Sequence, residues 1–125
     1  MTTRILLVDD FEPWRLAARS LLKAIPDFQV VGEASNGLDA IEKAATLLPD
    51  VVLLDIGMPL LNGIEAAKKI RQCCPQSKII FLTQQNDDDV RSVALAAGAD
   101  AYLLKSQSGH ELRSTIATYL VRSAA

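Results

Sequence analysis

The sequence has few of the features that secreted, membrane-spanning or nucleic-acid-binding domains require. Its two cysteines, Cys73 and Cys74, are adjacent and cannot link distant segments, so we expect two thiols in a reducing cytosol. No signal peptide is recognisable, and Asp55 interrupts the longest apolar stretch before the roughly 18 residues that span a bilayer. The net charge is -2, without a cluster of lysine and arginine. These absences predict a cytoplasmic location and argue against contact with a membrane or direct contact with nucleic acid.

What the chain does have is enough apolar sequence for one ordinary core. It contains 125 residues, of which 50% are hydrophobic. Chains of this length usually fold around a single core without disulfides or a structural metal. We find no linker, internal repeat or low-complexity segment, and we therefore predict a single domain that includes residues 1–125.

Five short segments are apolar throughout and rich in branched side chains. A continuous apolar run, in contrast to an alternating one, is typical of a strand that is covered on both faces of a sheet. We therefore predict strands at Ile5–Val8, Val30–Val31, Val51–Leu54, Ile79–Leu82 and Ala101–Leu104.

Between these segments, apolar residues recur at the spacing of one helix face, and Pro13 suits the first turn of the first helix. The predicted buried stripes are Trp14, Ala17, Ala18, Leu21, Leu22 and Ile25 in the first helix; Leu38, Ile41, Ala45 and Leu48 in the second; Ile64, Ala67, Ile70 and Cys74 in the third; Val90, Val93, Ala94 and Ala97 in the fourth; and Leu112, Ile116, Tyr119 and Leu120 in the fifth. Strands that alternate with helices in this way indicate an α/β fold, in which helices cover both faces of a parallel sheet.

Polar side chains follow directly after four of the five apolar runs. Asp9 and Asp10 follow the first run, Asp55 the third, Thr83 the fourth and Lys105 the fifth. In an open parallel sheet, the carboxyl ends of the strands lie at one edge, where ligands bind. The sequence thus predicts that these side chains meet in one site.

These residue types suit phosphoryl transfer assisted by a divalent cation. Three ionised carboxylates repel one another unless a cation lies among them, and Mg²⁺ prefers oxygen ligands of this kind. A carboxylate can attack phosphorus while a lysine and a hydroxyl group hold the phosphoryl oxygens. Asp55 is the best candidate nucleophile because its strand is central in the inferred sheet, and Gly57 permits close approach of the backbone to the metal.

The same residues also have purely structural interpretations. Asp9 or Asp10 would serve as the N-cap of the first helix, although a cap accounts for only one of them. Lys105 alone would be interpreted as a solvated loop lysine. The joint placement of the polar residues favours the site over these separate explanations. The acidic run that begins at Asp87, in contrast, is interpreted as the start of the fourth helix, capped by Asp87 itself or by Asn86.

Several short motifs occur together along almost the whole chain, from Ile5 to about Val121. They are Val8-Asp9-Asp10, the stretch from Asp55 to Gly63, Thr83, the segment Ala97–Tyr102, and Lys105. In this order and at these spacings they resemble the receiver domain of bacterial two-component response regulators, in particular the NarL/FixJ type. The resemblance implies a doubly wound, flavodoxin-like sheet with strand order 2-1-3-4-5 and five helices.

The resemblance also implies a role for each acidic residue. Asp55 would accept a phosphoryl group from a sensor histidine kinase or a phosphotransfer protein. Asp10 would bind Mg²⁺ directly and Asp9 mostly through water, and the Asp55 carboxylate and the Gly57 carbonyl group would complete the protein ligands. The implied function is a phosphorylation-dependent signalling switch and not an enzyme.

Other positions receive roles from the resemblance or depart from it. Thr83 and Lys105 would contact the phosphoryl oxygens, and Tyr102 would be an aromatic switch that turns inward on activation. Gln84 stands where the family usually has a small residue, and its longer side chain is expected to crowd the phosphoryl pocket or to alter hydrolysis. Ser106 stands where proline, often after a cis bond, is common in the family.

The implied partners are an upstream kinase or phosphotransfer protein and an output domain or effector protein, and a homodimer is a further candidate. Regulators of the NarL/FixJ type usually carry a helix-turn-helix domain after the receiver. The sequence contains no such domain, so we expect either a stand-alone receiver or a piece of a longer regulator.

Three other functions remain open at this point. A phosphotransfer enzyme with an aspartyl-phosphate intermediate is disfavoured, because such enzymes usually place a second acid where this chain has Gly57. A pseudo-receiver that binds partners without phosphorylation is favoured only by Gln84. A flavin-binding domain would need a hydroxyl-rich loop after the first strand, which the sequence lacks.

Overall fold

The fold is a parallel sheet between two layers of helices. This computed structural model describes residues 2–58, 60–84, 87–107 and 111–118. The elements are β1 (Thr3–Val8), α1 (Glu12–Lys23), β2 (Phe28–Ala34), α2 (Gly37–Leu47), β3 (Val51–Leu54), α3 (Gly63–Cys73), β4 (Lys78–Thr83), α4 (Asp88–Ala96) and β5 (Ala101–Leu104), followed by a 3₁₀ turn at Lys105–Gln107 and a fifth helix over residues 111–118. The five parallel strands lie in the order β2-β1-β3-β4-β5, which confirms the predicted doubly wound, flavodoxin-like topology.

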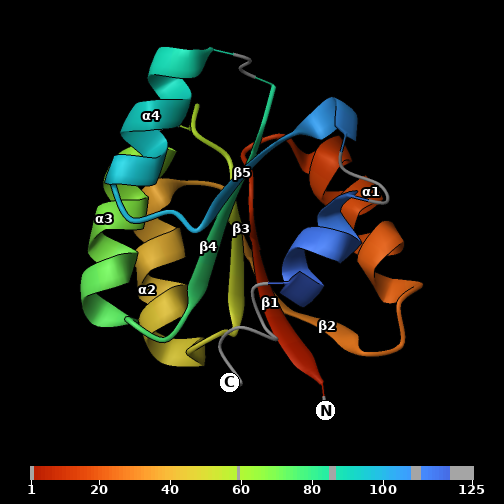
Figure 1. Cartoon of the computed structure of the whole chain (residues 1–125). Helices are drawn as coiled ribbons and strands as arrows, with labels where there is room; N and C mark the ends of the chain where they lie inside the picture. The colour runs from red at the N-terminus through yellow and green to blue at the C-terminus, as the bar shows by residue number, and fades with distance from the viewer. Residues whose placement is uncertain (1, 59, 85–86, 108–110, 119–125) are drawn as a thin grey trace.

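Helices cover both faces of the sheet (Figure 1). On one face, Val52, Leu54 and Phe81 belong to a core shared with α2, α3 and α4. On the other face, Leu7 and Leu53 belong to a core shared with α1 and the fifth helix. Because alternate side chains of a strand point to opposite faces, both sets must be apolar, as the continuous apolar runs predicted.

The predicted buried stripe of α2 is wrong at three of its four positions, whereas Ile41 is partly buried against the core. Leu38 and Leu48 are 54% and 60% exposed, and Ala45 is exposed as well. Ala40 and Ala44 are fully buried instead, in the core that α2 shares with α3 and the sheet. Small side chains let the helix approach its neighbours closely, so they occupy the contact face and the larger leucines lie outside it.

Parts of the predicted stripes in α1 and α4 are also exposed. Leu21 is 37% exposed and Val93 is 52% exposed. Ile25 lies beyond the last residue of α1. The buried residues of α1 are Ala18 and Leu22, so its contact face is narrower than the predicted one.

The remaining two predicted helix faces agree with the structure. Ala67 and Ile70 of α3 are buried, and so are Leu112 and Ile116 of the fifth helix. Residues 119 and 120, also assigned to that buried face, lie outside the described residues. Within the described part of the chain, no helix is both long enough and apolar enough to cross a membrane.

Both cysteines at the end of α3 are thiols, as predicted. Cys73 is exposed, whereas Cys74 is buried. Burial, and next the neighbouring Cys73, raise the pKa of the Cys74 thiol to about 12. This thiol therefore stays protonated and unreactive at neutral pH.

Candidate functional site

The carboxyl edge of the sheet brings the predicted acidic residues together. Asp9 extends the hydrogen-bond ladder between β1 and β2 by one residue, because its N–H group donates to the carbonyl oxygen of Ala34 over 3.0 Å. Asp55 likewise extends the hydrogen-bond ladder between β3 and β1, because its N–H group donates to the carbonyl oxygen of Val8 over 3.1 Å. One carboxylate oxygen from each of Asp9, Asp10 and Asp55 lies within 4.8 Å of the others. The three carboxylates therefore form one cluster.

An open pocket includes one member of this cluster. The residues that line it are Asp55, Gly57, Thr83, Gln84 and Lys105. Thr83 is the last residue of β4, and Lys105 directly follows β5. The two predicted phosphoryl contacts thus share a pocket with the predicted acceptor.

Asp9 is buried and does not cap a helix. Its side chain is 1% exposed, and its Oδ1 atom accepts a hydrogen bond from the N–H group of Phe11 over 2.9 Å. The N-cap residue of α1 is Phe11, and no side chain caps this helix, so the capping interpretation of Asp9 and Asp10 is wrong. The buried Oδ2 atom accepts no well-aligned hydrogen bond within the described residues, although the Lys105 ammonium lies close to it. Asp9 therefore presents one buried carboxylate oxygen to cationic groups.

Lys105 is the cationic partner of two carboxylates. Its Nζ atom lies 2.6 Å from Asp9 Oδ2 and 3.9 Å from Asp55 Oδ2, and its side chain is only 10% exposed. The ammonium also lies 5.1 Å from the ring centroid of Trp14, within the range of a cation–π interaction. The interpretation of Lys105 as a solvated loop residue is therefore wrong.

The charges of the site are not balanced by the protein alone. Burial, and next the nearby Asp9 carboxylate, raise the pKa of Asp55 above its ordinary value. The Lys105 ammonium, the N–H group of Ile56 and the Thr83 hydroxyl act in the opposite direction and do not outweigh them. The cluster of three carboxylates therefore favours the arrival of a further cation.

The residues of the cluster fit a divalent cation that prefers oxygen ligands. Carboxylates suit Mg²⁺ better than they suit soft metals. The Asp9 Oδ2 atom is buried without a well-aligned donor, Asp10 is exposed to solvent, and Gly57 lines the adjoining pocket. Asp9, Asp10 and Asp55 could thus hold Mg²⁺, whose charge would offset the repulsion among the three carboxylates.

The sequence profile of the response regulator receiver domain matches residues 5–117. The chain belongs to this family. The receiver domain is 42% identical over 113 residues to the transcriptional regulatory protein LiaR of Bacillus subtilis, which covers 90% of this chain and 54% of LiaR. It is 39% identical over 116 residues to the response regulator protein VraR of Staphylococcus aureus, which covers 93% of this chain and 56% of VraR. The chain thus spans about half the length of these curated relatives.

A solved structure of another response regulator has the same fold as this receiver domain. The two-component response regulator of the LuxR family from Aurantimonas sp. SI85-9A1 has a TM-score of 0.91 and 34% identity, over 97% of this chain and 86% of that chain. Together with LiaR and VraR, this likeness confirms a NarL/FixJ-like receiver domain of two-component systems.

Tyr102 of the receiver domain lies in the interior, in contact with β4 and α4. It is 8% exposed, and its ring centroid lies 6.4 Å from that of Phe81. The guanidinium carbon of Arg91 lies 5.8 Å from the same ring. Burial, and next the Asp87 carboxylate, raise the pKa of the Tyr102 phenol. The inward orientation is the one that the resemblance associates with activation, and the switching role itself stays a prediction.

The two departures from the family pattern lie beside the site of the receiver domain. Gln84 is exposed and lines the same pocket as Asp55, so its side chain borders the place of a phosphoryl group. Ser106 lies in the 3₁₀ turn after β5. The described residues contain no cis peptide bond, so the bond between Lys105 and Ser106 is trans.

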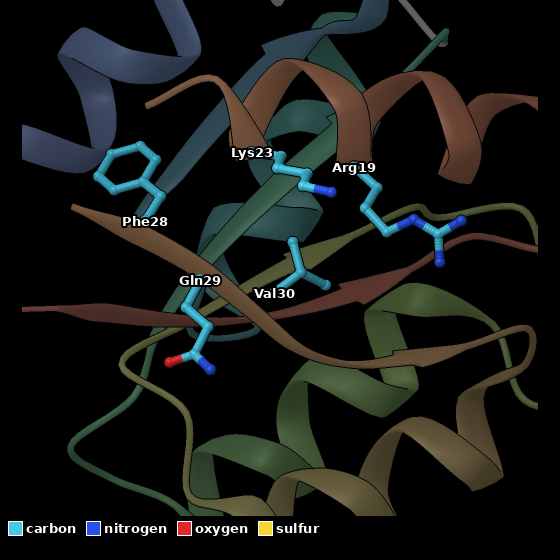
Figure 2. Close-up of a pocket in the computed structure, with 5 residues that line it drawn as sticks. All are labelled: Arg19, Lys23, Phe28, Gln29 and Val30. Atoms are coloured by element: carbon cyan, nitrogen blue, oxygen red, sulfur yellow. The ribbon is translucent and has the colours of Figure 1, made fainter. Parts of the chain in front are cut away.

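A second groove lies away from this chemistry, between α1 and the edge strand β2 (Figure 2). Its lining residues are Arg19, Lys23, Phe28, Gln29 and Val30. None of these five carries a carboxylate, thiol or hydroxyl group, and none belongs to the acidic cluster. We therefore assign no chemistry to this groove.

Two residues that shape the site were given no structural role on the basis of the sequence. A Cβ atom at Gly63 would lie only 1.9 Å from the carbonyl oxygen of Asp55, so only glycine fits there without a shift of the backbone. Arg15 donates to the carbonyl oxygen of Asp9 over 2.5 Å. The motif around Gly63 was a signal for a backbone constraint, whereas no local pattern indicates what Arg15 contacts.

Replacement of Asp55 by asparagine is expected to stabilise the metal-free receiver domain at pH 7, on the order of 1 kcal/mol. The pKa of Asp55 in the folded state is raised above its ordinary value of 3.8, so folding favours the protonated carboxyl group. The protonated carboxyl group of Asp55 therefore contributes its full stability to the wild-type protein below the unfolded-state pKa. This contribution is lost as the pH rises through the folded-state pKa. Urea unfolding in a chelator from pH 4 to pH 7 should show the advantage of Asp55→Asn growing with pH. An advantage that shrinks as the pH rises would contradict this electrostatic account.

Proposed function

We propose that this receiver domain is a phosphorylation-dependent signalling switch in which Asp55 is the phosphoryl acceptor. One observation carries the proposal: the buried Asp55 carboxylate lies within one site with two other carboxylates, an ammonium and a hydroxyl group. These are the groups that phosphoryl transfer to a carboxylate requires, namely a nucleophile, ligands for a metal and donors to the phosphoryl oxygens.

In the proposed reaction, a carboxylate oxygen of Asp55 forms a bond to phosphorus while the bond between phosphorus and the imidazole nitrogen of a phosphohistidine breaks. The electron pair of the broken bond stays on the imidazole of the donor. The Lys105 ammonium and the Thr83 hydroxyl, which line the same pocket as Asp55, would hold the phosphoryl oxygens. Bound Mg²⁺ would neutralise negative charge on those oxygens during the transfer.

The proposed Mg²⁺ ligands are Asp9, Asp10, Asp55 and the carbonyl group of Gly57. Mg²⁺ usually binds one or two carboxylates directly and retains several waters. Asp9 already accepts a hydrogen bond from Phe11 and lies beside an ammonium, which favours contact through water. Asp10 is exposed and Asp55 lines the pocket, which favours direct ligation by these two carboxylates.

The proposed output is a shift between two conformers of the receiver domain. Thr83 ends the strand in which Phe81 contacts Tyr102, so a phosphoryl group on Asp55 that draws the Thr83 hydroxyl would disturb the packing of that ring. Arg91 of α4 lies over the same ring. We therefore propose that the surface of α4, β5 and the fifth helix transmits the signal.

The proposed upstream partner is a sensor histidine kinase or a phosphotransfer protein, and the downstream partner is an output domain or effector protein. LiaR is a transcriptional regulatory protein, and this chain covers 54% of it, which favours an output domain in a longer protein. The net charge of -2 favours contact with nucleic acid by that output domain and not by the receiver. We also propose a cytoplasmic location, a signalling role without substrate turnover, and a homodimer as one means of output.

Phosphorylation by a small donor tests the proposal directly. After incubation with Mg²⁺ and acetyl phosphate, the intact mass of the protein is expected to increase by one phosphoryl group. Asp55→Asn should gain none, and removal of Mg²⁺ by a chelator should lower the adduct by roughly tenfold or more. An adduct that persists in Asp55→Asn would assign the acceptor role to another residue.

The pseudo-receiver is the second candidate function, because the Gln84 side chain borders the pocket. In that case the folded wild-type protein would bind Mg²⁺ and form no adduct with acetyl phosphate. Gln84→Ala separates the two cases: an adduct that forms only in this variant would show that Gln84 excludes the phosphoryl group.

A further inference from the structure

Three of the polar groups of Asp9 have fixed partners. Its N–H group donates to the carbonyl oxygen of Ala34 over 3.0 Å, and its carbonyl oxygen accepts from Arg15 Nη1 over 2.5 Å. Its Oδ1 atom accepts from the N–H group of Phe11 over 2.9 Å. The oxygen that remains, Oδ2, lies beside Lys105 in the site. The orientation of this oxygen therefore depends on how firmly the backbone of Asp9 is held.

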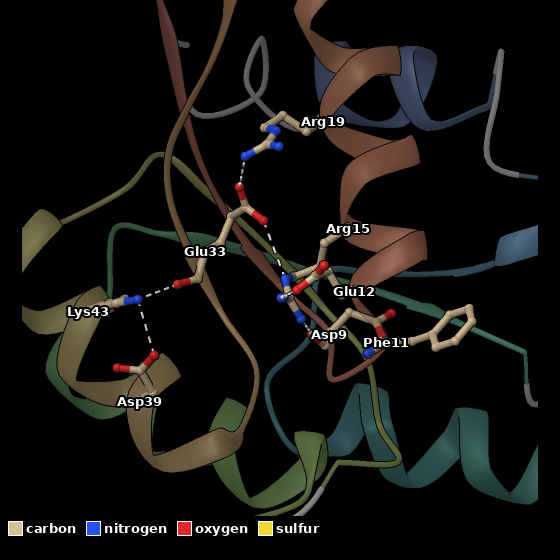
Figure 3. A network of polar contacts seen from close by, with 8 residues as sticks. All are labelled: Asp9, Phe11, Glu12, Arg15, Arg19, Glu33, Asp39 and Lys43. Carbon is tan, nitrogen blue, oxygen red and sulfur yellow. Dashed lines mark hydrogen bonds and ion pairs between the residues drawn. The ribbon is translucent and has the colours of Figure 1, made fainter.

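Glu33 of β2 orients the guanidinium group of Arg15 (Figure 3). Arg15 Nε lies 3.3 Å from Glu33 Oε1, and Arg19 Nη1 lies 2.7 Å from the other carboxylate oxygen of Glu33. The carbonyl oxygen of Glu33 also accepts a hydrogen bond from Lys43 of α2. The side chains of Arg15 and Glu33 are 15% and 25% exposed. Arg15 Nη2 also lies 3.9 Å from the exposed Glu12 carboxylate. A planar, half-buried guanidinium group with such ion pairs is pre-organised for its hydrogen bond to Asp9.

From these contacts we infer that Arg15, oriented by Glu33, is a positioning residue for the cation site. It holds the carbonyl group of Asp9, and thereby the backbone from which Asp9 and Asp10 reach the ion. The inference rests on the proposed function, which supplies Mg²⁺ as the ion. Groups that orient metal ligands contribute strongly to affinity, and Mg²⁺ demands near-ideal octahedral geometry.

The charge of Arg15 by itself has the opposite effect. A cation near a metal site repels the metal, so removal of the guanidinium charge alone would strengthen Mg²⁺ binding. A loss of affinity on removal of Arg15 would therefore report its positioning role. Arg19 provides a matched control, because it also pairs with Glu33 but donates no hydrogen bond to Asp9 among the contacts of the described residues.

The test is the dissociation constant for Mg²⁺, obtained from amide chemical shifts in an NMR titration of the full chain. Arg15→Met is expected to weaken Mg²⁺ binding about tenfold, whereas Arg19→Met should change it by less than about twofold. At saturating Mg²⁺, the rate of phosphorylation of Arg15→Met should return to within about threefold of the wild-type rate, because only the metal-binding step is affected. A role in folding alone would lower the urea midpoint and leave the dissociation constant unchanged.

Arg15→Lys keeps the charge but cannot reach both Asp9 and Glu33 in the same way, and it should weaken binding by roughly threefold. If Arg15→Met does not fold, this variant decides the question, since an unchanged affinity would overturn the inference. Affinity equal to or tighter than wild type in folded Arg15→Met would overturn it as well. If the wild-type protein binds no Mg²⁺, the proposed function and this inference both fail. If the wild-type protein binds Mg²⁺ and the Arg15 variants have the same dissociation constant, only the inference fails.

Discussion

Replacement of Gly63 by alanine is expected to lower the free energy of unfolding by about 3 kcal/mol and to slow the proposed phosphorylation by about a hundredfold. A Cβ atom at this position would lie 1.9 Å from the carbonyl oxygen of Asp55 and 2.7 Å from the Cα atom of Ile56. Both are backbone atoms, which cannot rotate away as the end of a side chain can. The start of α3 and the loop after β3 would therefore have to separate.

This separation affects the chemistry because the loop carries the proposed acceptor. The N–H group of Gly63 donates to the carbonyl oxygen of Ile56 over 2.8 Å, and Ile56 directly follows Asp55. A shift of this loop moves the Asp55 carboxylate relative to Lys105, which now lies 3.9 Å from it. Misplacement of a reacting group by about 1 Å is enough to cost two orders of magnitude in rate.

Two control variants separate this effect from ordinary losses of stability. Asn62→Ala removes the cap of α3, in which the Asn62 side chain accepts from the N–H group of Glu65 over 3.0 Å, and should cost about 1 kcal/mol without loss of phosphorylation. Gly32→Ala brings a Cβ atom near the ends of two side chains, 2.7 Å from Leu47 Cδ1 and 3.3 Å from Leu6 Cδ1, and should cost less than Gly63→Ala because no backbone atom is in the way. Urea unfolding and the acetyl phosphate assay measure both properties. Wild-type values of both in Gly63→Ala would disprove the close contact with Asp55.

Replacement of Arg71 by methionine is expected to lower the free energy of unfolding by about 3 kcal/mol and to leave Mg²⁺ affinity unchanged. Its Nε and Nη2 atoms donate to the carbonyl oxygen of Gly98 over 3.2 and 2.8 Å. Its Nη1 atom donates to the carbonyl oxygens of Pro75 and Ser77 over 3.2 and 2.8 Å. Nη2 also pairs with Asp100 Oδ2 over 2.8 Å. One side chain thus joins the end of α3 to the segments that precede β4 and β5.

The loss of stability arises because removal of Arg71 leaves its buried and half-buried partners without their hydrogen-bond donor. Asp100 Oδ2 also accepts from the N–H group of Ile79 over 2.9 Å, and the Asp100 side chain is only 24% exposed. Loss of the guanidinium group would leave this carboxylate with an uncompensated charge. Ile79 lies at the start of β4 whereas Thr83 ends it, so the change occurs at the edge of the sheet opposite the acidic cluster.

Lys68→Met is the matched control on the same helix. The Lys68 side chain is 51% exposed and pairs with Glu65 over 3.4 Å, so its loss should change stability by less than about 0.5 kcal/mol. Urea unfolding measures both variants, and the Mg²⁺ titration should give wild-type affinity for both. Equal stability of Arg71→Met and Lys68→Met would show that the contacts of Arg71 contribute little.

The positions of the strands along the chain and the place of the acidic cluster followed from local features of the sequence. Val51–Leu54 is apolar throughout and is followed at once by Asp55, and both the strand and the position of the carboxylate were predicted correctly. The same holds for Thr83 and Lys105, which follow other buried strands. A change from apolar to polar within one residue marks the end of a buried strand, and parallel strands end at a common edge.

The buried faces of the helices were less predictable, because they depend on distances between elements. In α2 the leucines suggested the contact face, yet Ala40 and Ala44 are buried and Leu38 is exposed. Periodicity shows that a helix has an apolar side, but when apolar residues cover more than one stripe it does not show which stripe packs. That choice is made by how closely the sheet and α3 approach.

The sequence by itself determined which residues this protein brings to the carboxyl edge of its sheet, since each follows its own strand directly. Only the tertiary structure decided which other residues contact these site residues and constrain their backbone. Arg15 and Glu33 are 18 positions apart and meet because α1 packs beside β2. Gly63 meets the Asp55 carbonyl oxygen because α3 begins against the loop after β3. Such contacts depend on the packing of whole elements against one another, and no pattern confined to one segment of the chain encodes them.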